Sequence, residues 1–245
     1  MNHTGYEPLA VATREALARS GSATIANCLL KRGLRNTFMV GLQPLAPGQT
    51  VMVGPAFTLR FIPSREDIDT MATYARNDNL HRRAVEECPA GAVLVLAPGG
   101  DSGASVMGDL MALRLKVRGV QGVVTDGGYR DTPGIRATGL PCFQRISSGP
   151  ATPIRLHPVE LNGPVGVAGV PVYPGDIVVG DPEGVVVIPR HLLDEVAAEA
   201  AAHADYEVFA AAQIAKGHSL FGLFPASAHS REAFDQWVAA GRPDL

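Results

Sequence analysis

Continuous apolar runs alternate with an amphipathic stretch in the middle of the chain. Residues 92–97 (AVLVLA) are wholly apolar, and residues 120–125 (VQGVVT) are nearly so. Between them, apolar residues recur over 110–117, and basic residues gather toward the end of this segment. Buried strands separated by a helix are typical of a parallel βαβ unit that is covered on both faces. The pattern therefore predicts an α/β fold.

Helical patterns also lie on both sides of this unit. From residue 8 to about 32 two helical patterns follow one another, and Gly21 interrupts them. A charged helix is expected over 78–88, where His81 and its basic and acidic neighbours form a solvated face without catalytic weight. Pro189 begins a long helix that ends at Gly217.

The remaining patterns are of the β type. Residues 50–62 favour a strand, with a bulge or break at Gly54-Pro55, and residues 64–67 are expected to begin a helix. Short strands joined by proline and glycine turns are expected over 165–172, 176–179 and 184–188. No linker precedes them, so we expect them to form a second layer of the same domain.

Composition is that of an ordinary globular protein, since 46% of the 245 residues are apolar and 18% are charged. One domain over 1–245 is expected, with a core of about 25–217. The tail 218–245 contains Trp237 and other apolar residues that are expected to dock on the body or on a neighbouring subunit.

Charge and cysteine usage narrow the class of protein. A formal net charge of −3 gives no basic footprint for nucleic acid. No run approaches the ~18 apolar residues that cross a bilayer, and the polar start, residues 2–6, lacks the regions of a secretory signal. Cys28, Cys88 and Cys142 are far apart and form no CxxC pair, which favours a reduced, cytoplasmic protein without structural zinc.

A glycine-aspartate pair begins the central helical pattern. Asp109 is expected to be the N-cap, so that the amides of the first turn, from Gly108 to Leu110 and Met111, face outward without partners. A small carboxylate is a natural guest at such a helix start. A cap without any ligand is the alternative, and residue type alone favours it.

A second glycine turn follows the strand at 120–125 and ends in Arg130-Asp131. Twenty residues separate Asp109 from Arg130, about what one helix and one strand need to return to the same sheet edge. Arg130 offers a planar fork for a carboxylate, and Asp131 an oxygen ligand for magnesium. The alternative is a surface Arg-Asp pair, although adjacent residues on an extended segment point apart.

Other motifs give weaker signals. The seven histidines show no HExxH pattern and no clustering, so a zinc site is not expected. The glycine-rich segment 99–103 matches neither the Walker A pattern nor GxGxxG and is expected to be a mobile active-site loop. Ser102 and Ser105 lack the context of a serine nucleophile. Asp181 and Glu183 are assigned to a turn.

Together these motifs resemble a known family. GDLM at 108–111, the D-x20-R-D spacing, VVTDGGYRDTPGIRATGLPCF and PGDIVVGDPEGVVVIP are similar to the family that joins RraA-like proteins with class II 4-hydroxy-4-methyl-2-oxoglutarate (HMG) aldolases. The likeness extends from about Ile25 to Gly217. It implies a β/β/α swivelling-domain (phosphohistidine-domain-like) sandwich with N- and C-terminal helices, assembled as a homotrimer or as a hexamer, a dimer of trimers.

The resemblance also implies a pyruvate aldolase site between subunits that depends on Mg²⁺ or Mn²⁺. It assigns the metal to Asp131, and the pyruvyl carboxylate to Arg130 and the amides of Gly108 to Met111. Asp109 is assigned to a water molecule of the metal. Glu207 is matched to a carboxylate that a neighbour's C-terminal helix contributes.

Elementary chemistry agrees with this assignment. A 2-keto acid chelates a divalent cation, and the cation with Arg130 stabilises the enolate that forms when the bond between carbons three and four breaks. Oxaloacetate decarboxylation gives the same enolate and is an expected side activity. Two alternatives stay open. One is a non-catalytic regulator like the RraA proteins that bind ribonuclease E, and the other is a lyase or dehydratase for a sugar-acid-derived 2-keto acid.

Overall fold

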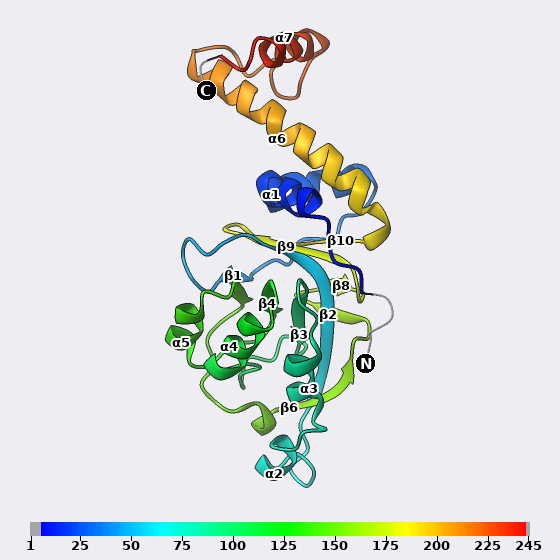
Figure 1. Ribbon diagram of the computed structural model, residues 1–245, viewed down its shortest axis with the longest axis vertical. Helices are drawn as coiled ribbons and strands as arrows, with labels where there is room; N and C mark the ends of the chain where they lie inside the picture. The colour runs from blue at the N-terminus through cyan, green and yellow to red at the C-terminus, as the bar shows by residue number, and fades with distance from the viewer. Residues whose placement is uncertain (1–5, 244–245) are drawn as a thin grey trace.

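An eight-stranded mixed sheet forms the centre of the computed structural model, which describes residues 6–243 (Figure 1). The strand order is β1-β5-β4-β3-β2-β9-β10, and β6 also pairs with β2. The strands are β1 Gln43–Pro44, β2 Met52–Pro63, β3 Val93–Ala97, β4 Gly122–Thr125, β5 Cys142–Gln144, β6 Leu156–Leu161, β9 Ile177–Asp181 and β10 Gly184–Ile188. Helices lie at both ends of the chain, so the predicted mixed α/β fold is confirmed. Of the expected domain, 1–245, residues 1–5 and 244–245 lie outside the described part, as does most of the polar start.

Strands β2 to β5 run parallel and carry the predicted βαβ units. Every residue of β3 and β4 is buried, which explains why both read as continuous apolar runs. The helices between them pack on one face of the sheet and share one apolar cluster with it: α3 Leu80–Glu87, α4 Asp109–Val117 and α5 Thr132–Thr138. The carboxyl ends of β3 and β4 therefore meet at one edge.

The valine-rich region is divided between two sheets. The hairpin of β7 Val165–Val167 and β8 Val170–Val172 covers the other face of the sheet, where its valines pack against β3 and β4. Strands β9 and β10 instead extend the main sheet, because β9 pairs antiparallel with the first residues of β2. The expected second layer thus consists of the β7–β8 hairpin alone.

The predicted break in the long strand β2 is at the wrong place. Gly54 and Pro55 pair regularly with β9, and the register shift lies between Arg60 and Phe61, where β6 joins. The absence of a side chain at Gly54 instead allows the backbone at Gly91 to come close, since a Cβ atom at Gly54 would lie 2.5 Å from the carbonyl oxygen of Gly91.

Two long helices pack together at the β9–β10 end of the sheet (Figure 1). Helix α1, Val11–Lys31, is interrupted at Gly21 as predicted, because that residue has a φ angle of 77°. Helix α6, Leu193–Ala215, follows a short 3₁₀ turn at Arg190–Leu192. The expected helix start at 64–67 is a turn, and helix α2, Met71–Tyr74, comes later. A second 3₁₀ turn occupies Thr152–Ile154.

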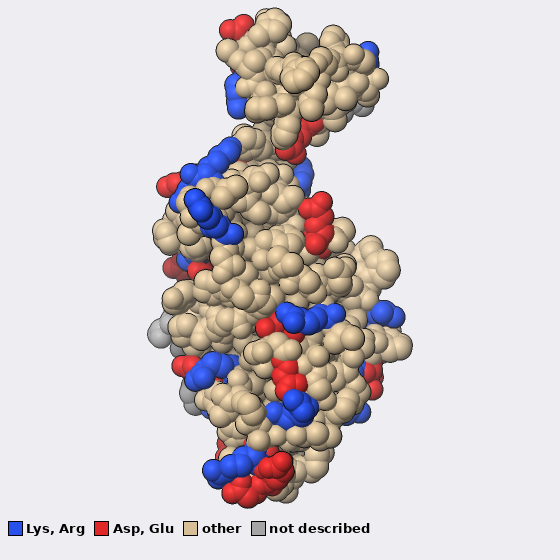
Figure 2. Space-filling view, turned by 180° about the vertical axis from the view of Figure 1, so that it is seen from behind, with Lys and Arg blue, Asp and Glu red and all other residues tan. Residues whose placement is uncertain are grey.

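The tail contains a helix that the sequence pattern did not predict, α7 Ala228–Ala239. It docks on the far end of α6 through Tyr206, Phe209, Phe234 and Trp237, away from the sheet (Figure 1). Basic and acidic side chains are interspersed over the face of the molecule that Figure 2 shows. Within residues 6–243, no helix combines the length and the apolar character that crossing a membrane requires.

Candidate active site at the carboxyl ends of β3 and β4

Two loops are joined by backbone hydrogen bonds where β3 and β4 end. The amide of Val106 donates to the carbonyl oxygen of Gly128 at 2.9 Å, and the amide of Arg130 donates to that of Met107 at 3.0 Å. A parallel bridge between Ser105 and Gly128 adds to this ladder. The structure thereby places the start of α4 directly beside Arg130 and Asp131.

Helix α4 begins one residue earlier than expected. Gly108 is the N-cap, with extended backbone, and Asp109 is the first helical residue, so the assignment of Asp109 as N-cap is wrong. The Asp109 side chain accepts a hydrogen bond from the next amide, that of Leu110, through Oδ1 at 2.8 Å. The amides of Gly108, Asp109 and Met111 have no partner among the described residues and carry the positive end of the helix dipole.

Arg130 and Asp131 contact each other, contrary to the expectation that they point apart. Asp131 has a left-handed backbone, with a φ angle of 53°, rather than an extended one. Its Oδ2 atom accepts a hydrogen bond from Nε of Arg130 at 3.0 Å. Both side chains are nearly half exposed, at 45% and 44%. Within residues 6–243 the two terminal NH₂ groups of Arg130 and the Oδ1 atom of Asp131 remain without partners.

Two glycines make room for the carboxylates. A Cβ atom at Gly108 would lie 3.1 Å from Oδ2 of Asp131, and one at Gly134 would lie 2.7 Å from both Cβ and Oδ2 of Asp109. The start of α4 and the first turn of α5 therefore approach each other closely around these groups. A larger side chain at either glycine would displace a carboxylate.

Tyr129 anchors the turn that presents Arg130. Its side chain is fully buried, its amide donates to Oε1 of Gln144 at 2.8 Å, and its hydroxyl donates to the carbonyl oxygen of Phe143 at 3.0 Å. Burial raises the pKa of this hydroxyl well above its ordinary value. Tyr129 is thus a fixed neutral support rather than a proton donor to a ligand.

His81 supports the other loop, although the sequence pattern placed it on a solvated face. It is 1% exposed, and its Nε2 atom lies 2.6 Å from the carbonyl oxygen of Val106. A carbonyl only accepts, so Nε2 carries the proton. Burial lowers the pKa of His81 to about 4, so the ring is neutral near pH 7. The rings of Phe61 and Tyr74 pack against it at centroid distances of 5.4 and 5.6 Å.

Tyr74 brings a hydroxyl to the surroundings of the site. Burial raises its pKa, while a hydrogen bond with Thr152 and the positive charges of Arg82 and Arg130 oppose that rise. Neither residue carries a signal in the sequence, because Tyr74 belongs to no motif and His81 lies within a run of charged residues.

The glycine-rich loop at 99–103 is held by an ion pair. Arg155 Nη2 lies 2.9 Å from Oδ2 of Asp101, and the amide of Gly103 donates to Oδ1 of Asp101 at 2.7 Å. The hydrogen bond from Arg155 lowers the pKa of Asp101. Ser105 donates its hydroxyl to the carbonyl oxygen of Pro150 at 2.8 Å, which leaves it unsuited to act as a nucleophile.

Glu207 is not brought to this edge within one chain. It lies on α6 and lines a cavity together with residues of α1 and the tail, such as Asn27 and Arg231. Helix α6 packs on α1 at the β9–β10 end, whereas β3 and β4 end on the side toward α2 and β6 (Figure 1). Glu207 and Arg130 therefore lie at opposite ends of the sheet in one chain.

The donor atoms at the edge suit a hard divalent cation. Oδ1 of Asp131 and Oδ2 of Asp109 are carboxylate oxygens without partners among the described residues. Asp131 is exposed, so water molecules and ligand oxygens can complete a coordination shell around it. Oxygen ligands of this kind, with few protein groups and several waters, fit Mg²⁺ or Mn²⁺.

A family model described as RraA-like, Aldolase/RraA, matches residues 22–187, a range that includes every residue of this edge but not Glu207. A protein of Halalkalibacterium halodurans that is provisionally named a 4-hydroxy-4-methyl-2-oxoglutarate aldolase is 34% identical over 153 residues, which cover 61% of this chain and 64% of that protein. Protein DlpA of Legionella pneumophila is 30% identical over 182 residues, 74% of this chain but 28% of DlpA. The chain thus spans less than two thirds of both relatives.

Solved structures share the fold. A protein from Pseudomonas syringae of uncharacterised function superposes with a TM-score of 0.78 at 25% identity, over 91% of this chain and 97% of that one. RraAS2 of Streptomyces coelicolor, described as an unusual member of the RNase ES inhibitor RraA protein family, superposes with a TM-score of 0.72 at 32% identity, over 83% of this chain and 98% of that one.

Proposed function

Because the chain belongs to the Aldolase/RraA family, we propose that it is a divalent-metal-dependent lyase that cleaves a 4-hydroxy-2-keto acid, such as HMG, to pyruvate. The observation that carries this proposal is a group of polar atoms that have no partner within residues 6–243: the fork of Arg130, amides at the start of α4 and two carboxylate oxygens. The name of the Halalkalibacterium halodurans relative supports this substrate class.

Arg130 and the helix start bind the substrate carboxylate. The terminal NH₂ groups of the guanidinium form a planar pair of donors that matches the two oxygens of a carboxylate. The amides of Gly108 and Met111 add neutral donors at the positive end of α4. Because Asp131 fixes Nε of Arg130 at 3.0 Å, the fork is oriented before the substrate arrives.

The two carboxylates divide the remaining tasks. Asp131 would hold the cation, and Mg²⁺ or Mn²⁺ bound there supplies a Lewis acid for the charge that develops on the 2-keto oxygen. Asp109 accepts the proton of the hydroxyl on carbon four through Oδ2, directly or through one water molecule. The electrons of the bond between carbons three and four pass to the pyruvyl fragment as an enolate, and carbon four becomes a carbonyl. Protonation of the enolate at carbon three gives pyruvate.

The same residues allow oxaloacetate decarboxylation as a side activity. Loss of carbon dioxide from oxaloacetate gives the enolate of pyruvate without any proton transfer by Asp109. Substitution of Asp109 by asparagine is therefore expected to lower aldol cleavage more than decarboxylation.

We also propose that the active form is a homotrimer or a hexamer, a dimer of trimers, in which Glu207 of one copy faces Arg130 of another. The position of Glu207 on α6, away from Arg130 of its own chain, supports this arrangement. Glu207→Gln should then lower turnover without changing the unfolding of the chain, and mixing Glu207→Gln with Arg130→Lys chains should restore part of the activity in mixed oligomers.

Pyruvate release from HMG and from oxaloacetate tests the proposal. Release is expected with Mg²⁺ or Mn²⁺ and should stop with EDTA. Arg130→Lys should lower it, whereas Arg114→Lys, which changes a surface pair with Glu86 on the outer side of α4, should not. No metal-dependent turnover of either substrate by the folded protein would contradict the lyase assignment.

A non-catalytic regulator is the second candidate. The likeness to RraAS2, at 32% identity over 83% of this chain, favours it. In that case the protein would bind a ribonuclease E and would release no pyruvate with any metal. Binding measured by surface plasmon resonance, with Arg130→Lys alongside, separates the two functions, because a regulator has no need of that fork.

A further inference from the structure

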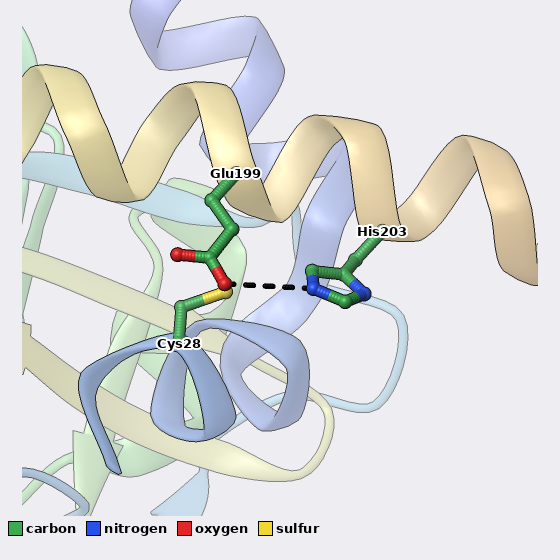
Figure 3. A group of neighbouring side chains, drawn as sticks. All are labelled: Cys28, Glu199 and His203. Carbon is green, nitrogen blue, oxygen red and sulfur yellow. Dashed lines mark ion pairs between the residues drawn. The ribbon is translucent and has the colours of Figure 1, made fainter. Parts of the chain in front are cut away.

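A second group of metal-binding side chains lies between the two long helices. Cys28 extends from α1 toward Glu199 and His203 on α6 (Figure 3). Their ligand atoms all lie within 4.8 Å of one another. The sequence gives no sign of this group, because α1 and α6 lie at opposite ends of the chain and meet only in the fold.

Two of the three ligands already point at a positive charge. The Lys31 ammonium lies 2.9 Å from Oε1 of Glu199 and 2.7 Å from Nε2 of His203. An ammonium has donors only, so Nε2 of His203 must present its lone pair. The carboxylate oxygen Oε1 of Glu199 likewise accepts from the ammonium. Both groups thus direct lone pairs at the place that the ammonium occupies.

We propose that Cys28, Glu199 and His203 form a binding site for a borderline-soft divalent cation such as Zn²⁺, and that the Lys31 ammonium fills this position in the metal-free chain. Thiolate, imidazole and carboxylate together are the donor set that zinc prefers. On binding, the Cys28 thiol releases its proton to solvent, and Lys31, whose side chain is 54% exposed, turns outward.

The spacing of the donors fits this ion. A tetrahedral zinc with bonds of about 2.0 Å places its nitrogen and oxygen ligands about 3.3 Å apart, and Nε2 of His203 lies 3.5 Å from Oε1 of Glu199. Arg32 holds the other oxygen of Glu199, Oε2, at 2.5 Å, which keeps Oε1 turned toward the site. The sulfur of Cys28 lies within 4.8 Å of both of these donor atoms.

The proposed site leaves one coordination position of the cation open. Cys28, Lys31 and His203 line a cavity of about 350 Å³ between α1, α6 and the tail around Phe224. When Lys31 leaves, this cavity borders the fourth coordination position, which a water molecule or a small ligand can occupy. Three protein ligands and one open position distinguish such a site from a closed structural zinc site.

Metal titration of the full-length protein tests the proposal. Zn²⁺ affinity is measured by calorimetry, and Co²⁺ is used as a probe because a cobalt-thiolate bond gives a charge-transfer absorption. Cys28→Ser should abolish that absorption and weaken Zn²⁺ binding at least about tenfold, as should His203→Gln. Cys88→Ser, which removes another buried thiol, is the matched control and should change neither.

Lys31→Met distinguishes a metal site from a purely structural effect of substitutions in α1. Removing the competing ammonium should tighten Zn²⁺ binding, whereas a substitution that merely disturbs α1 would weaken it. Thermal unfolding of each variant confirms that it is folded. The proposal is overturned if neither the natural chain nor Lys31→Met binds Zn²⁺, or if Cys28→Ser binds Co²⁺ with the same absorption as Cys88→Ser.

Discussion

Replacement of Gly134 by alanine tests the packing around Asp109. A Cβ atom there would lie 2.7 Å from Cβ and Oδ2 of Asp109, about 0.8 Å inside an ordinary carbon contact of ~3.5 Å. The Cβ of Asp109 sits on the backbone of α4 and cannot turn aside as the end of a long side chain would. We expect Gly134→Ala to lower the free energy of unfolding by about 1–3 kcal/mol, the usual cost of overpacking.

Gly134→Ala should also reduce activity, by more than its loss of folding stability alone would cause. A displacement of Asp109 approaching 1 Å can lower turnover by about 100-fold. The measurements are kcat/KM for pyruvate release and chemical denaturation of the same samples. Gly166→Ala is the matched control, because a Cβ atom at Gly166 would meet nothing within 4 Å. Equal stability and activity of Gly134→Ala and Gly166→Ala would refute the close packing inferred here.

Three further changes probe the site. Arg130→Lys keeps the charge but loses one charge-assisted hydrogen bond of the fork, worth ~1.5–3 kcal/mol, so kcat/KM for pyruvate release should fall about 10- to 150-fold. The folded pKa of His81, about 4, lies below its ordinary value of 6.5, so the unfolded chain binds a proton that the folded chain excludes. The free energy of unfolding, measured by denaturation, should therefore fall by up to about 3 kcal/mol as pH decreases from about 6.5 to 4. The His81→Gln variant should lose less stability over the same pH range. Asp131→Asn should leave unfolding in EDTA unchanged but abolish the activation of pyruvate release by Mg²⁺.

Much of the central fold could be predicted from local patterns. The apolar runs at 92–97 and 120–125 became β3 and β4 because strands buried on both faces need no polar alternation. Gly21 broke the first helix because only glycine readily adopts its positive φ angle. The apolar residues of the tail indicated that it docks, but helix α7 and its contacts with α6 could not be predicted, since no local pattern encodes them.

The sequence pattern indicated which residues of the two loops meet at this edge, but it indicated neither how they meet nor that Glu207 lies elsewhere in the chain. The spacing between Asp109 and Arg130 indicated that they return to one edge, and the hydrogen bonds between the two loops show how. The left-handed backbone of Asp131, which turns it toward Arg130, has no signature in the sequence because only its neighbours enforce it. The prediction that His81 lies on a solvated face is wrong because the charged residues around it hide the buried face of α3.

Calorimetric binding of oxalate, a stable mimic of the pyruvate enolate, tests the central claim most directly, because it requires the Arg130 fork and the metal carboxylate but no turnover. The account predicts that oxalate binds in the presence of Mg²⁺, that EDTA or Asp131→Asn abolishes binding, and that Arg130→Lys weakens it by about tenfold or more. Binding of equal strength in Mg²⁺ and in EDTA, or binding that Asp131→Asn and Arg130→Lys leave unchanged, would contradict it.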